Sequence, residues 1–139
     1  MANRPNYRLL PTTFLASVAI TSNACVIAAA GAGAGGAVYV TDREVDSQLA
    51  LPVDAAYEAV RKAFHGLGIA EGKYSTEHEG AREERTLTGR TPDREVSVKV
   101  KSEGAGSRIS VTVRHDEVIW DKKFARTIVE RIVEESRAK

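Results

Sequence analysis

The chain is poor in the residues that build most small functional sites. Its 139 residues include one cysteine, three histidines, four prolines and one tryptophan. A single cysteine cannot form an internal disulfide framework or a four-thiolate zinc site. Net charge is also small, because 20 basic residues balance 19 acidic ones, and this excludes a strongly basic nucleic-acid binder as the default interpretation. With 42% hydrophobic residues, the chain is long enough for one domain with a modest core.

Charge is absent from a long amino-terminal stretch. Arg4 and Arg8 are the only charged residues before Asp42, and residues 9–20 are rich in leucine, isoleucine, valine and phenylalanine. Residues 1–24 therefore have the layout of a signal peptide or of a membrane anchor. Because the positive end stays on the cytoplasmic side, we expect residues 42 onward to lie outside the cytoplasm.

The only cysteine lies where the signal would end. Ser22 and Ala24 have the small side chains and the spacing that cleavage after residue 24 requires. Cys25 would then become the amino terminus, and its lipidation would hold the protein on a bilayer. Two alternatives stay open, which are an uncleaved membrane anchor and a soluble exported protein with a free thiol.

Residues 25–38, the cysteine and the alanine- and glycine-rich segment that follows it, are interpreted as a flexible tether. Gly31, Gly33 and Gly36 match the spacing of a dinucleotide-binding loop, but that loop needs a strand before it and a helix after it. Here a signal-like segment comes before, and residues 37–40 favour a strand, so we reject a nucleotide site. The spacing of Gly31 and Gly35 would also allow two membrane helices to approach closely.

Residues 39–139 are predicted to form a single α+β domain. Alternating polar and apolar residues predict strands over 45–51, 95–101 and 108–114, and two further strands with a weaker pattern are expected over 69–78 and 82–90. Apolar residues at three- and four-residue spacing predict two helices, over 53–67 and from between 116 and 121 to 136. The expected order is β-α-β-β-β-β-α, an antiparallel sheet of about five strands with two helices packed on one face and Trp120 at the rim of that contact.

The whole chain resembles a family of small, uncharacterised bacterial envelope lipoproteins, a domain of unknown function. The resemblance rests on Cys25, the segment 31–37, Leu67-Gly68-Ile69, the turn Thr91-Pro92-Asp93 and the valine-rich strands over 96–113. It implies an envelope lipoprotein and supplies no catalytic residue. The lipobox of such proteins prefers leucine where this chain has Ser22. Val26 after the cysteine would favour the outer over the inner membrane under the common enteric sorting rule.

The sequence contains no recognisable catalytic or metal-binding constellation. His65, His78 and His115 lie far apart, and none belongs to a two-histidine zinc motif. The run His115-Asp116-Glu117 has the composition of a general-base cluster, but no nucleophile accompanies it, and Asp116 is interpreted as a cap of the last helix. We therefore expect no catalytic residue, no metal ion and no cofactor.

Four basic residues of the late hairpin are expected on one polar face: Lys99, Lys101, Arg108 and Arg114. This hairpin stripe would meet anionic lipid headgroups or an acidic partner, or it would simply keep the sheet face soluble. The sequence thus predicts a non-enzymatic, membrane-anchored domain facing the periplasm, with the membrane and an envelope protein as partners and no nucleic acid. The alternative is a carrier of a small apolar ligand or lipid, with Tyr57, Phe64 and Trp120 lining its cavity.

Overall fold

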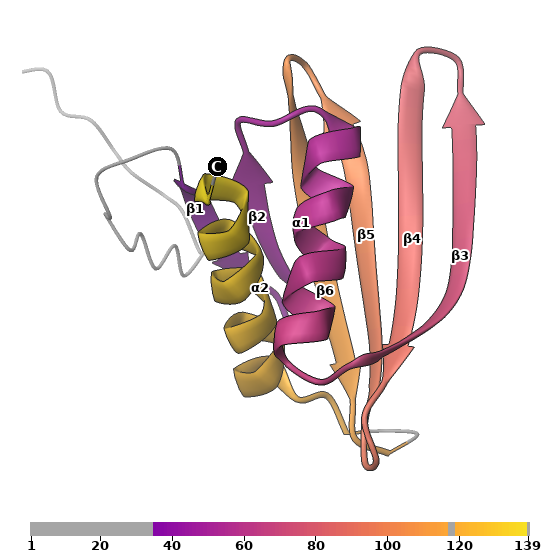
Figure 1. The fold of residues 1–139 in the computed structure, drawn as a ribbon, viewed down its shortest axis with the longest axis vertical. Helices are drawn as coiled ribbons and strands as arrows, with labels where there is room; N and C mark the ends of the chain where they lie inside the picture. The colour runs from indigo at the N-terminus through magenta and orange to yellow at the C-terminus, as the bar shows by residue number, and fades with distance from the viewer. Residues whose placement is uncertain (1–34, 117–118, 139) are drawn as a thin grey trace, which may run out of the picture.

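A computed structural model describes residues 35–116 and 119–138. The elements are β1 (Gly35–Val40), β2 (Val45–Leu49), α1 (Val53–Gly66), β3 (Ala70–Glu79), β4 (Arg82–Arg90), β5 (Glu95–Glu103), β6 (Gly106–Arg114) and α2 (Lys122–Arg137). The six strands form one antiparallel sheet in the order β1-β2-β6-β5-β4-β3, and both helices pack on the same face of it (Figure 1). The predicted α+β class and the placement of both helices on one face are confirmed.

The strand that sequence analysis did not place in the sheet is β1. It begins at Gly35, within the segment predicted as a tether, and pairs with β2 through Val38 opposite Ser47 and Val40 opposite Val45. The pairing is irregular between Gly35 and Val38. Residues 37–40 favour a strand in the sequence, but the two glycines and the alanine at its start have low strand propensity and no alternation, so the earlier start of the strand and its place in the sheet were not predicted. The sheet therefore has six strands where about five were expected.

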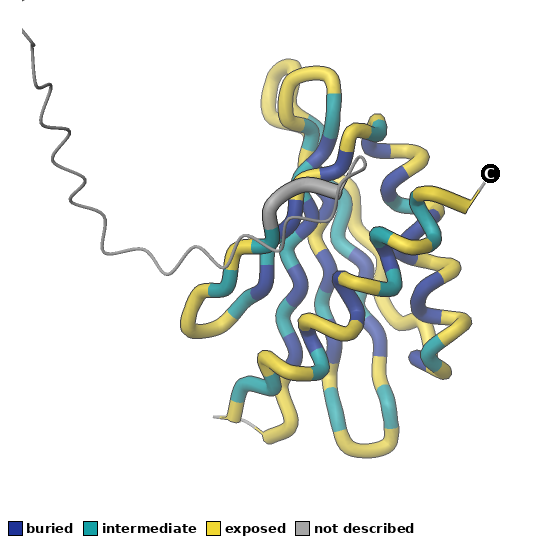
Figure 2. The backbone as a smooth tube through the Cα atoms, turned by 90° about the vertical axis from the view of Figure 1, so that its left-hand side faces the viewer, coloured by how far each residue is buried: buried dark blue, intermediate teal, exposed yellow. Residues whose placement is uncertain are grey.

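The core lies between the sheet and the two helices. Three valines of β5 pair directly with β6, Val96 with Val113, Val98 with Val111 and Val100 with Ile109, and each of the six is at most 2% exposed. Their alternation with polar residues is the reason that one face of the sheet is buried (Figure 2). The hydroxyls of Ser47 and Ser107 are buried beside this layer without a hydrogen-bond partner.

The two helices pack on different parts of the same sheet face. Helix α2 contacts β6 and β2, whereas α1 contacts β3, β4, β5 and β6. Asp121 caps α2, because its side chain accepts a hydrogen bond from the Phe124 backbone N–H at 2.9 Å. The cap predicted at Asp116 is therefore wrong. The opposite face of the sheet is covered by no element of the described chain, and it carries the polar side chains of the strands.

Candidate functional site

The hairpin stripe lies on the uncovered face of the sheet, as the alternation predicts. Lys101 is paired with Arg108 across β5 and β6, and Arg114 is paired with Glu95. Lys99 and Arg114 are exposed, but every member of the stripe has an acidic neighbour. The ion pairs are Lys99 with Glu84 at 3.8 Å, Lys101 with Glu84 at 2.8 Å, Arg108 with Glu103 at 2.8 Å and Arg114 with Glu95 at 2.6 Å.

These ion pairs alter how the carboxylates titrate. The hydrogen bond from Lys101 lowers the pKa of Glu84, and that from Arg108 lowers the pKa of Glu103. Hydrogen bonds from Arg90 and Arg114 lower the pKa of Glu95. All three carboxylates therefore stay ionised at neutral pH and partly balance the four positive charges of the hairpin stripe. This balance leaves the stripe less positive than its four cations suggest, and its contact with an anionic surface stays a prediction.

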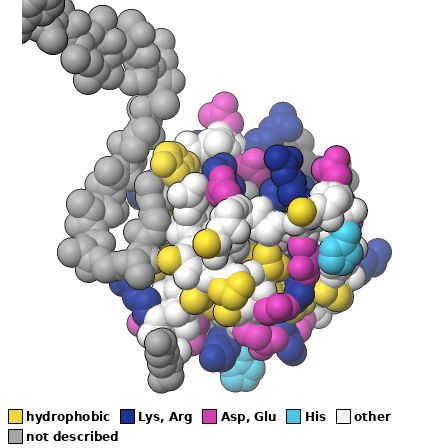
Figure 3. All heavy atoms as spheres, turned by 90° about the horizontal axis from the view of Figure 1, so that it is seen from above, with side chains coloured by type: hydrophobic (Ala, Val, Ile, Leu, Met, Phe, Trp, Pro, Cys, Tyr) yellow, Lys and Arg dark blue, Asp and Glu magenta, His cyan; other side chains and the backbone are white. Residues whose placement is uncertain are grey.

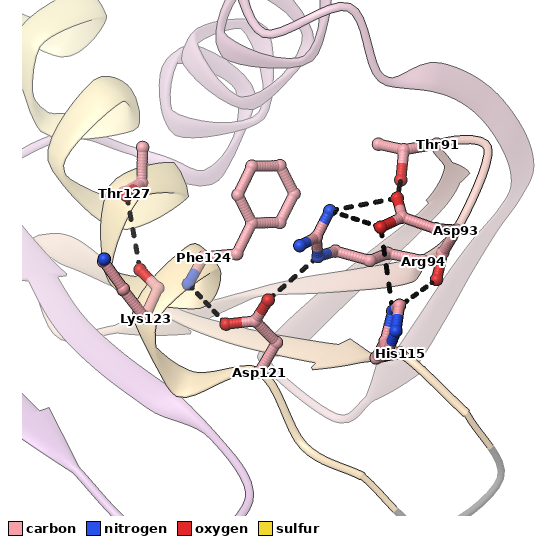
Figure 4. Close-up of polar contacts among 8 residues, drawn as sticks. All are labelled: Thr91, Asp93, Arg94, His115, Asp121, Lys123, Phe124 and Thr127. Carbon is pink, nitrogen blue, oxygen red and sulfur yellow. Dashed lines mark hydrogen bonds and ion pairs between the residues drawn. The ribbon is translucent and has the colours of Figure 1, made fainter.

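A second polar cluster joins the turn between β4 and β5 to the start of α2 (Figure 4). Arg94 donates from Nε to Asp121 at 2.8 Å and from Nη1 to Asp93 at 2.9 Å, and its guanidinium lies 5.0 Å from the centre of the Phe124 ring. The Thr91 hydroxyl donates to Asp93 at 3.1 Å. Arg94 thus connects two parts of the chain that are distant in sequence, and its Nε and Nη1 donors are engaged within the fold.

His115 borders this cluster beside an open surface cleft of about 640 Å³. Its Nδ1 lies 2.9 Å from the backbone oxygen of Asp93 and 3.7 Å from that residue's carboxylate. Asp116 lines the same cleft. The Thr91 hydroxyl of this cluster is bonded to Asp93 rather than to His115, so it is not an activated nucleophile beside that imidazole.

Asp121 is expected to be the most important residue of this cluster for stability. Asp121→Ala removes both the helix cap and a partner of Arg94, and we expect it to lower the free energy of unfolding by about 1–2 kcal/mol. Asp121→Asn keeps an acceptor for the Phe124 N–H and should lose less. Urea denaturation of both variants at pH 7 measures the difference; an equal loss in the two would contradict the role of the cap.

The Asp121 carboxylate should also make the free energy of unfolding depend on pH in a defined direction. The hydrogen bond from the Phe124 N–H, followed by that from Arg94, lowers the pKa of Asp121 below its usual 3.8. A carboxylate with a lowered folded-state pKa stabilises the protein fully above its unfolded pKa, and this contribution disappears as pH falls through the folded value. The stability advantage of the natural chain over Asp121→Asn should therefore shrink below about pH 4.

The other candidate residues do not gather into a site. His65 lies at the end of α1 and His78 near the tip of the β3–β4 hairpin, whereas His115 follows β6. Within the described ranges, no group of three or more His, Cys, Asp and Glu residues could hold a metal ion. Within those same ranges, no helix is both long enough and apolar enough to span a bilayer. Cys25 and the predicted leader lie outside these residues.

The residues proposed to line a carrier cavity occupy three separate environments. Phe64 is fully buried in the core, Tyr57 packs against Tyr74 of β3 with ring centres 5.2 Å apart, and Trp120 lies half-buried under Arg43. The rim position predicted for Trp120 agrees with this partial burial. The placement of the three rings gives no specific support to the carrier alternative.

The sequence alone does not predict that Arg43 and Trp120 meet. The guanidinium of Arg43 lies 5.8 Å from the centre of the Trp120 ring, and Trp120 forms an antiparallel bridge with Arg114. Arg43 belongs to the distant β1–β2 turn, and only the fold brings it to Trp120.

Comparison with known proteins identifies the family. Residues 8–135 match the family model described as a protein of unknown function, DUF3568, and the chain therefore belongs to this family. The expectation of a domain of unknown function is confirmed, whereas lipid attachment and an envelope location stay predictions. No curated protein matches the chain.

Proposed function

We propose that this DUF3568 protein is a membrane-anchored domain of the cell envelope that acts through structure or protein contacts rather than through catalysis. The observation that carries the proposal is the uncharged stretch over residues 9–41, which follows two arginines and contains Cys25 after small residues. The family match begins at residue 8. The uncharged segment and Cys25 thus lie inside the region that the family model matches, together with the α+β domain.

The geometry of the fold is compatible with such an anchor. The first described strand begins at Gly35, and the chain between Cys25 and Gly35 can extend at most about 35 Å. A lipidated Cys25 would therefore keep the domain next to the bilayer. The paired charges of the sheet face and of the Arg94 cluster support a structural role for these residues, because their donors are engaged by neighbouring carboxylates.

Intact mass spectrometry of the full chain, expressed in a bacterium and extracted from membranes, tests the proposal. We expect a mass that begins at Cys25 and includes diacylglyceryl and acyl groups. A membrane-bound protein whose mass begins at Met1 or Ala2 would instead establish an uncleaved anchor. Cys25→Ala should abolish the lipid-modified mass, whereas the neighbouring Val26→Ala should preserve it. Recovery of the natural chain in the cytosol with residues 1–24 intact would overturn the proposal.

A further inference from the structure

We infer that the open edge of β3 pairs with the same edge of a second copy of this chain, so that two sheets join into one. This inference goes beyond the proposed function and does not depend on how the chain is anchored. Strand β3 ends the strand order of the sheet, and no described element lies beyond it in Figure 1. It is the longest of the six strands, and all ten of its residues are exposed. An exposed edge strand of this length is a template for pairing with another chain.

The backbone groups of β3 alternate between its two sides. The Lys73 N–H donates to the Thr88 hydroxyl at 2.8 Å, and that hydroxyl donates to the Lys73 backbone oxygen at 3.1 Å, so both groups of Lys73 point toward β4. Because this direction alternates along an antiparallel strand, the backbone groups of Tyr74, Thr76 and His78 point to the open edge. The residues that flank the two-residue loop after β3 point their backbone groups at each other, which gives the same assignment.

Antiparallel geometry leaves few ways to pair two copies of β3. Residues whose backbone groups point to the shared edge must lie opposite one another, so the two-fold axis passes through a residue rather than between two. Only axes through Tyr74 or Ser75 keep nine of the ten residues of β3 paired. The axis through Tyr74 places Glu71 opposite Glu77, which are like charges. The axis through Ser75 places Lys73 of each copy opposite Glu77 of the other, which gives two pairs of unlike charges.

The charges at this edge suit a second copy. Lys73 and Glu77 are exposed, and neither forms an ion pair with a described residue. The axis through the middle of β3 also brings Glu71 opposite Glu79, but each is compensated within its own copy, since Glu71 forms an ion pair with α1 and Glu79 lies opposite Arg82. The end of the domain that includes the β3–β4 loop, seen from above in Figure 3, carries both acidic and basic side chains. A partner of mixed charge therefore fits this edge better than one of a single sign.

The axis through Ser75 also covers an exposed aromatic ring. Tyr74 is 53% exposed, and its ring packs against Tyr57 of α1 on the helix side of the sheet. Its hydroxyl accepts a hydrogen bond from that of Thr76, which lies on the same side. In the pairing, Tyr74 of each copy stands opposite Thr76 of the other, and pairs of an aromatic and a β-branched residue stabilise antiparallel strands. The dimer would thus bury a ring that the single domain leaves accessible.

The opposite edge of the sheet does not specify a partner in this way. Strand β1 has six residues, none of them charged, and its register with β2 is irregular between Gly35 and Val38. No pair of unlike charges can therefore fix the register of a second strand against β1. The longer, charged edge of β3 is the one that selects a particular alignment.

A cysteine at position 75 tests the contact directly. Opposite residues of a non-hydrogen-bonded pair have Cα atoms about 4.5 Å apart, which a disulfide can span. In mild detergent with copper phenanthroline, the full chain with Ser75→Cys should give at least about fivefold more disulfide-linked dimer than the natural chain, whose own Cys25 sets the baseline. Glu77→Cys is the matched control, because its two cysteines would lie about 13 Å apart along the strands. Equal yields from the two variants on a non-reducing gel would overturn the inference.

Charge reversal tests the alignment. Sedimentation velocity of the full chain in mild detergent should show a dimer, and Lys73→Glu should raise its dissociation constant about tenfold, because both cross-strand pairs become like charges. Adding Glu77→Lys to this variant restores unlike pairs and should return the constant to within about threefold of the natural value. Lys123→Glu, an exposed reversal on α2, should leave it unchanged. Circular dichroism verifies that each variant folds.

The inference and the proposed function can fail separately. A natural chain that stays monomeric, or a dimer that Lys73→Glu does not weaken, would overturn the pairing of β3 edges. A dimer that Ser75→Cys does not cross-link would assign the contact to another surface and would also overturn it. None of these results bears on lipid attachment at Cys25, which intact mass measures.

Discussion

Phe64→Ala is expected to lower the free energy of unfolding by about 3–5 kcal/mol. Phe64 is the largest fully buried side chain of the core, and it lies on α1 between the helix and the sheet. Its removal would leave a cavity that the surrounding side chains cannot fill, because the strands of the sheet are held in register by their neighbours. A domain of this size is stabilised by only about 5–15 kcal/mol, so the loss is a large fraction of the total.

Urea denaturation monitored by circular dichroism measures this effect in the full chain. Glu58→Ala is a matched control on the exposed face of the same helix, and it should change the free energy of unfolding by no more than about 0.5 kcal/mol. A loss below about 1 kcal/mol in Phe64→Ala would contradict a close-packed core at this position.

Much of the fold can be predicted from the sequence, because the spacing of apolar residues within each strand or helix shows which of its faces is buried. Val96 to Val100 and Ile109 to Val113 alternate with polar residues, and the structure buries those faces against the helices. Strand β1 could not be placed in the sheet in this way. Its first residues, Gly35 and Gly36, have no side chains to alternate, and the strand exists because β2 offers an edge for pairing. Tertiary pairing overrides a local pattern that indicates a tether.

For the candidate sites too, local patterns predict some features, whereas others depend on tertiary pairing. Alternation correctly predicts that the hairpin stripe shares one face, but it does not identify the carboxylates beside it. Glu84 comes from β4, and only the register between β4 and β5 places it opposite Lys101. The contact between Arg43 and Trp120 needs even more of the fold, since these residues meet through the packing of distant segments. Sequence patterns predict which face a residue occupies, whereas charge compensation depends on neighbours across strands.

Gly89→Ala tests the packing around Phe64 from the side of the sheet. A Cβ atom at Gly89 would lie 2.6 Å from the Phe64 ring and 2.6 Å from a methyl group of Ile69, both closer than real contacts allow. Strand β4 is paired with β3 on one side and β5 on the other, so it cannot move away. We expect the variant to lower the free energy of unfolding by about 1–3 kcal/mol.

A double-mutant cycle shows whether the Phe64 ring causes this loss. Leucine at position 64 does not reach as far as the ring, so Phe64→Leu combined with Gly89→Ala should be less destabilising than the sum of the single changes, by about 0.5–3 kcal/mol. Gly66→Ala is the control, because nothing lies within 4 Å of the added Cβ, and it should be neutral or stabilising by up to about 1 kcal/mol. Strict additivity in the cycle would mean that the aromatic ring is not what excludes a side chain at Gly89.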